Sequence, residues 1–140
     1  MSIWKTVATL EHLKEISRNT MMEHLGIEYL EVGEDFLKAR MPVDRRTHQP
    51  YGILHGGASV VLAETLGSLG AYLCVDPERK RAVGLEINAN HLRPVSEGWV
   101  TGVAKPIHLG RTTQLWEIRI FNDQQKLVCI SRHTVAVIDK

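Results

Sequence analysis

One carboxylate, Glu64, lies in a stretch of the chain that is otherwise uncharged. Between Gly57 and Cys74 all the remaining residues are glycines or have side chains that are apolar or carry a hydroxyl group. Such a stretch must be mostly buried, and a buried carboxylate without a partner costs several kcal/mol or takes up a proton. Natural chains accept that cost mainly at functional sites, so Glu64 is the first candidate for chemistry.

The tripeptide His55-Gly56-Gly57 stands directly before this stretch. Backbone N–H groups at the start of a helix have no partner within the helix and can bind a developing oxyanion. The alternative is a flexible helix entry in which the histidine only makes structural hydrogen bonds.

Ser68 follows Glu64 by four residues. On a helix this spacing places both side chains on one face, where the hydroxyl can bind the carboxylate or a water held by it. A satisfied pair in the core, or a glutamate that faces solvent, is the alternative interpretation.

The spacing of Gly56 and Glu64 predicts a site shared by two chains. The two residues are eight positions apart, which on one helix means about 12 Å of rise and roughly 80° of rotation. A base that acts on a carbonyl must lie within a few ångströms of the donors that hold the carbonyl oxygen. Two antiparallel copies of the helix, related by a two-fold axis, satisfy this condition, so we expect a homodimer.

Helix and strand patterns surround these residues. Helical spacing of apolar residues predicts an N-terminal helix over 9–25 with a break near Asn19-Thr20. The alternating segments 27–32 and 36–41 predict a hairpin, and a long connection over 42–55 is typical of functional or mobile loops. Within the apolar helix, Gly67 and Gly70 indicate a place where another backbone approaches closely.

The second half of the chain consists of four strand-like segments, 82–92, 99–107, 114–121 and 127–138. Consecutive hairpins imply an antiparallel sheet, and a helix that is apolar on nearly all sides implies a sheet curled around it. We therefore predict an α+β fold with a long central helix over about 57–74, about six antiparallel strands and an N-terminal helix.

Composition limits the remaining choices. A chain of 140 residues fits one domain, 1–140, and a net charge of +1 does not suggest a nucleic-acid partner. The two cysteines lack the spacing of a disulfide framework or a zinc site, so a reduced cytoplasmic location is expected. From the sequence we expect no secretory signal, no membrane span and no cofactor.

Three segments carry a resemblance to a known family. They run from Gln49 to Ser68, from Val83 to His91 and from His108 to Arg111. Together they resemble hotdog-fold acyl-CoA thioesterases of the phenylacetate-pathway (PaaI) type, close to the dihydroxynaphthoyl-CoA and enterobactin proofreading thioesterases. The resemblance spans nearly the whole chain and implies a hotdog fold assembled as dimers and usually as dimers of dimers.

The resemblance also implies roles for individual residues. Glu64 would be the general base or nucleophile, and the Gly56 N–H would polarise the thioester carbonyl. Gln49 would position the acyl group or the water, His55 would support the turn, and Ser68 would hold the water or Glu64. Contacts with coenzyme A are expected from His91, Arg93, Gly110 and Arg111, and Tyr51 would contribute to the acyl pocket.

These observations predict hydrolysis of an aromatic or medium-chain acyl thioester of coenzyme A or of a carrier protein. The reaction needs oxyanion stabilisation and an activated nucleophile, and it needs no metal or redox cofactor. Two alternatives remain: a hydratase or dehydratase on the same fold, and a non-catalytic acyl-CoA binding protein.

Overall fold

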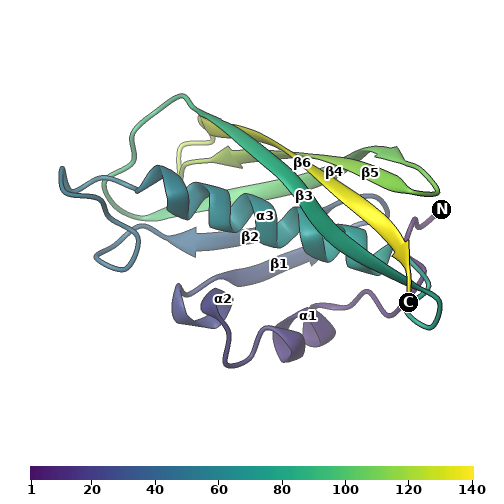
Figure 1. Ribbon diagram of the computed structural model, residues 1–140. Coiled ribbons are helices and arrows are strands. Elements are labelled where there is room, and N and C mark those ends of the chain that lie inside the picture. The colour runs from purple at the N-terminus through teal and green to yellow at the C-terminus, as the bar shows by residue number, and fades with distance from the viewer.

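Six antiparallel strands curve around one long helix in the computed structural model, which describes residues 1–140 (Figure 1). The strand order is β1-β2-β4-β5-β6-β3, so β1 and β3 are the two edges of the sheet. The predicted α+β architecture is confirmed. The elements are α1 (Leu10–Ile16), α2 (Met21–His24), β1 (Glu28–Val32), β2 (Leu37–Pro42), α3 (Gly56–Leu73), β3 (Lys80–His91), β4 (Trp99–Leu109), β5 (Thr113–Phe121) and β6 (Leu127–Asp139).

The central helix α3 begins and ends at local signals in the sequence. The Nδ1 atom of His55 accepts a hydrogen bond from the Gly57 N–H at 2.8 Å and so caps the start. The helix ends at Leu73, shortly before Asp76 and a proline that cannot continue it. It packs against β2, β3, β4, β5 and β6, and none of the helices combines the length and hydropathy needed to cross a membrane.

The N-terminal segment forms two short helices beside β1 (Figure 1). The Oγ1 atom of Thr9 caps α1 by accepting the His12 N–H at 3.1 Å. Asn19 then adopts a positive φ of 60°, which ends the first helical segment before α2 starts. The predicted break near this residue is confirmed.

Hydrogen bonds fix the long connection between β2 and α3. The Thr47 hydroxyl donates to the Pro42 carbonyl at 2.9 Å, and the His55 N–H donates to the Thr47 carbonyl at 2.8 Å. The Leu54 N–H donates to the Val95 carbonyl at 2.7 Å. The connection therefore holds the start of α3 in a defined position.

Side chains, and no second backbone, approach the two interior glycines of α3. A Cβ atom built on Gly67 would lie 3.0 Å from Cδ2 of His133, and one built on Gly70 would lie 2.6 Å from Cη2 of Trp116. The expected close backbone contact is wrong, because β5 and β6 place the rings of Trp116 and His133 against these two glycines. Trp116 is fully buried, and its ring stacks on that of Trp4.

Candidate active site

The turn before α3 leaves one backbone donor without an acceptor. His55 takes the Gly57 N–H, and its carbonyl accepts the N–H groups of Ala58 and Ser59 at 2.9 and 3.3 Å. The Gly56 N–H makes no hydrogen bond within the chain. Because the His55 Nδ1 atom acts as an acceptor, the proton of its neutral ring lies on Nε2.

Four of the residues predicted for the site meet at a cavity of about 340 Å³ next to this turn: Gln49, Gly56, His91 and Arg93. The His91 ring lies directly against the glycine, since a Cβ atom on Gly56 would be 2.8 Å from its Nε2 atom. The Gln49 side chain accepts the Tyr51 N–H through Oε1, which leaves its amide N–H groups free to donate. This cavity therefore offers backbone and side-chain donors and a cationic arginine to a polar ligand.

Glu64 and Ser68 line a different cavity of about 380 Å³ on the side of α3 that faces α2. The other lining residues are mostly apolar: Met21, Met22, Val60, Val61, Thr65 and Leu69. Glu64 makes no hydrogen bond and no ion pair, and it is half-buried in the single chain. The expectation of a deeply buried carboxylate is thus too strong for one copy, because the cavity is open on this side.

A residue that the sequence analysis missed binds Ser68. The His133 Nε2 atom lies 3.0 Å from the Ser68 Oγ atom, and its Nδ1 atom lies 3.1 Å from the Glu86 carbonyl oxygen. His133 comes from β6 and is 1% exposed. Its inward position on a strand that otherwise buries mostly apolar side chains was the available signal, since a buried imidazole requires partners.

The remaining predicted residues lie elsewhere in the chain. Tyr51 is 90% exposed and does not line the cavity at Gly56. Gly110 and Arg111 form the turn between β4 and β5, where the Gly110 N–H donates to the Thr113 carbonyl at 2.9 Å. This turn lies at the end of the sheet where β3 starts, whereas His91 is the last residue of β3.

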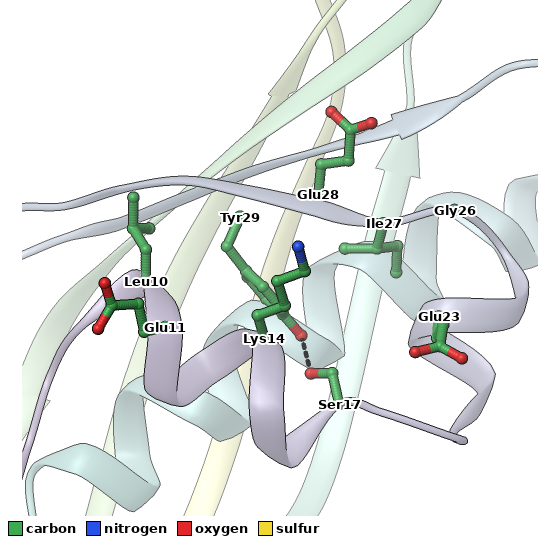
Figure 2. A pocket seen from close by; sticks show the side chains of 9 residues that line it. All are labelled: Leu10, Glu11, Lys14, Ser17, Glu23, Gly26, Ile27, Glu28 and Tyr29. Carbon is green, nitrogen blue, oxygen red and sulfur yellow. Dashed lines mark hydrogen bonds between the residues drawn. The ribbon is translucent and has the colours of Figure 1, made fainter.

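A third cavity, of about 470 Å³, lies between the N-terminal helices and β1 (Figure 2). Ser17 and Tyr29 are hydrogen-bonded to each other in this cavity, and burial raises the pKa of the Tyr29 hydroxyl. None of the residues predicted for the site contributes to its lining. It is therefore separate from the two cavities along α3.

The cysteines are poorly suited to act as nucleophiles. Burial raises the pKa of the Cys74 thiol to about 11 and also raises that of Cys129. The reactive thiolate is therefore scarce at neutral pH. No group of three or more His, Cys, Asp or Glu side chains is arranged to hold a metal ion.

Known proteins resemble this chain over almost its full length. The profile of the Thioesterase superfamily matches residues 51–129. The 1,4-dihydroxy-2-naphthoyl-CoA hydrolase of Escherichia coli is 53% identical over 97% of this chain and 99% of its own length. The proofreading thioesterase EntH of Cronobacter turicensis is 54% identical over 97% of this chain and 98% of its own length.

A solved structure agrees with the fold in detail. A mutant of thioesterase PA1618 from Pseudomonas aeruginosa superposes with a TM-score of 0.97 and 52% identity, covering 99% of this chain and all of that chain. The helix wrapped by six strands and the level of sequence identity point to the same family. The chain belongs to the thioesterase superfamily, has the hotdog fold that the sequence predicts, and is a thioester hydrolase.

Proposed function

We propose that this protein hydrolyses acyl-CoA thioesters at a site assembled from two copies of the chain. The observation that carries the proposal is the separation of the candidate groups: the free Gly56 N–H and the Glu64 carboxylate belong to one regular helix and line different cavities. Eight helical residues separate them by about 12 Å along the axis. A second, antiparallel copy of α3 would bring the Glu64 of one chain to the Gly56 of the other.

The exposed edge strand β3 supports the pairing of two copies. It is 12 residues long, and its outer side presents unpaired backbone groups together with Val83 and Leu85, which are 43% and 61% exposed. Antiparallel pairing of two β3 strands would bring the Gly110-Arg111 turn of one copy towards His91 of the other. The family resemblance further suggests that such dimers assemble in pairs.

Each group then has a chemical role. The Gly56 N–H would donate to the thioester carbonyl and stabilise the oxyanion, while His55 holds the turn. The free amide of Gln49 would position the acyl group or the attacking water. Glu64 would either take the proton of that water and pass it to the departing sulfur of coenzyme A, or attack the carbonyl itself, release coenzyme A as a thiolate and form an anhydride that water then hydrolyses. Incorporation of oxygen-18 into Glu64 in a single turnover would indicate direct attack.

The two cavities suggest how the substrate would be divided. The apolar cavity beside Glu64, with Met21 and Met22 on one wall, suits an aromatic or medium-length acyl group. A relative that is named for hydrolysis of 1,4-dihydroxy-2-naphthoyl-CoA supports an aromatic acyl group. His91 and Arg93, with Gly110 and Arg111 of a second copy, would contact the phosphates of coenzyme A.

The test is hydrolysis of a panel of acyl-CoA thioesters, ranked by kcat/KM and followed by the release of free thiol. Matched carrier-protein thioesters show which thiol is preferred. Glu64→Gln should lower kcat at least about 100-fold because a central catalytic group is lost. Glu78→Gln, which changes an exposed carboxylate outside both cavities, is the control. Near wild-type turnover by Glu64→Gln would contradict the proposed chemistry.

A further inference from the structure

His133 is a polar ring in the apolar layer between the sheet and α3. It lies on β6, whose alternate residues face the helix, and the neighbouring inward positions on either side hold Ser131 and Val135. The ring is 1% exposed. Burial of an imidazole is costly unless both nitrogens have partners, so the partners of this ring are informative.

Two glycines make room for the His133 ring. A Cβ atom on Gly67 of α3 would lie 3.0 Å from its Cδ2 atom, and a Cβ atom on Gly84 of β3 would lie 3.0 Å from its Cε1 atom. The helix side and the strand side therefore both lack the methyl group that any other residue would place there. The ring is held in one orientation between them.

The hydrogen bonds of His133 determine which nitrogen carries the proton. The Glu86 carbonyl oxygen, 3.1 Å from Nδ1, can only accept, so Nδ1 must be the donor. In the neutral ring Nε2 is then an acceptor, and the Ser68 hydroxyl, 3.0 Å away, must donate to it. The proton of Ser68 is thus used in the bond to His133 and is not donated to Glu64, which lies one helical turn before it.

This direction leaves the Ser68 oxygen as an acceptor beside the Glu64 carboxylate. The His133 ring and Glu64 border the same space beside Gly84, since a Cβ atom built on this glycine would lie 3.4 Å from the His133 Nε2 atom and 3.9 Å from the Glu64 Oε1 atom. A water bound there would donate one O–H to each acceptor and present its lone pair outward. That is the orientation needed for attack on a carbonyl carbon.

We propose that His133 is a positioning residue that fixes the Ser68 hydroxyl as a donor to itself, so that Ser68 orients the nucleophilic water and does not donate to Glu64. This inference rests on the proposed function of Glu64. Without His133, Ser68 would donate to the carboxylate in a charge-assisted hydrogen bond and occupy the lone pair that must take up a proton or attack. Both routes of Glu64 chemistry would slow down.

Three substitutions at position 133 separate the two hydrogen bonds. His133→Gln places an amide near the position of Nε2, where its oxygen accepts the Ser68 hydroxyl. His133→Asn places an amide near Nδ1, where it donates to the Glu86 carbonyl and leaves Ser68 without an acceptor. His133→Leu keeps a similar volume and loses both bonds. We expect His133→Gln to retain kcat within about threefold. His133→Asn and His133→Leu should lower kcat about tenfold with KM unchanged, a loss that corresponds to one hydrogen bond.

A second background tests whether the effect passes through Ser68. In Ser68→Ala, adding His133→Leu should lower kcat no further. An equal loss in both backgrounds, or equal loss by the Gln and Asn variants, would show that the ring is only structural and would overturn the inference.

A spectroscopic measurement tests the proton position without activity. Nitrogen-15 NMR of labelled histidine should identify His133 as the Nδ1–H tautomer, assigned by the signal that is absent in His133→Gln. An Nε2–H tautomer would overturn the inference even if Glu64 proves to be essential. Conversely, an active Glu64→Gln variant would contradict the proposed function and leave this tautomer unchanged, so the two failures are distinguishable.

Discussion

Replacing Gly56 with proline should remove one backbone N–H from the turn before α3 and leave the fold intact. Gly56 is the first residue of α3, where proline is well tolerated because this N–H makes no helical hydrogen bond. The preceding residue, His55, has a φ of −67° and a ψ of 131°, an extended conformation that suits a residue before proline. The Gly56 N–H has no acceptor in the chain, so no existing hydrogen bond is lost.

The expected effect of Gly56→Pro is a loss of about 100- to 1,000-fold in kcat, which is typical when one oxyanion donor is removed. Gly56→Ala is the matched control because it keeps the N–H and introduces the same Cβ atom. That atom would lie 2.8 Å from the Nε2 atom of His91 in both variants, and the exposed His91 ring must move aside in both. Alanine therefore controls for the added Cβ atom and the displaced His91 ring, and proline differs from it by the lost N–H and by the two further carbon atoms of its ring.

The assay is steady-state hydrolysis of an aromatic acyl-CoA, with kcat and KM measured for both variants and for the unaltered protein. Thermal unfolding checks that the two variants keep the fold, and we expect similar midpoints because the helix loses no hydrogen bond. If Gly56→Pro turned over substrate as fast as Gly56→Ala, the Gly56 N–H would not be the oxyanion donor. The assignment of the turn would then be wrong.

Two further predictions concern the shared site and the core. An equimolar mixture of Gly56→Pro and Glu64→Gln chains, unfolded and refolded together, should recover about a quarter of wild-type activity. Half of the dimers are then mixed, and each mixed dimer has one intact site out of two. No recovery of activity would place both groups in one chain. Gly70→Ala puts a Cβ atom 2.6 Å from Cη2 of Trp116, so overpacking of about 1–3 kcal/mol should exceed the roughly 1 kcal/mol gained in helix propensity. Urea unfolding, measured at one protein concentration, should show a lower free energy of unfolding for Gly70→Ala. In a Trp116→Phe background, where the ring is shorter, Gly70→Ala should instead be stabilising. Destabilisation of equal size in both backgrounds would contradict the overpacking argument.

The elements of the fold are predictable because their signals are local. The apolar run of α3 starts after the glycine pair at Gly56 and stops before Pro77, and the structure places its ends within a residue of the predicted 57–74. Alternation along β5, with Trp116, Ile118 and Ile120 pointing inward, predicts that strand equally well. The strand order is not local. The pairing of β3 with β6, which makes β3 an edge, joins segments far apart in the sequence.

The residues of the candidate site were likewise predictable only where the signal is local in the sequence. Gly56, Glu64 and Ser68 are recognisable because they lie on one helix whose spacing can be worked out from the sequence, whereas Gln49, in the loop before that helix, is expected from the family resemblance. His133 was missed because its partner Ser68 is 65 residues away, and only the register of β6 on the sheet brings them together. Side-chain partners across the layer between helix and sheet do not follow from helical or strand periodicity.

The two groups of the proposed chemistry occupy different places on α3, and for this reason the proposed site includes a second copy of the chain. The proposed oxyanion donor is an unpaired backbone N–H group, and within α3 such groups exist only in the first turn. The carboxylate needs a side chain that reaches an apolar cavity, and Glu64 reaches one from the middle of α3, where the backbone is fully paired. A rigid helix cannot bring its own start and middle together, but an antiparallel partner helix can. The polar groups at the middle are accommodated because the sheet supplies His133, for which Gly67 and Gly84 leave room.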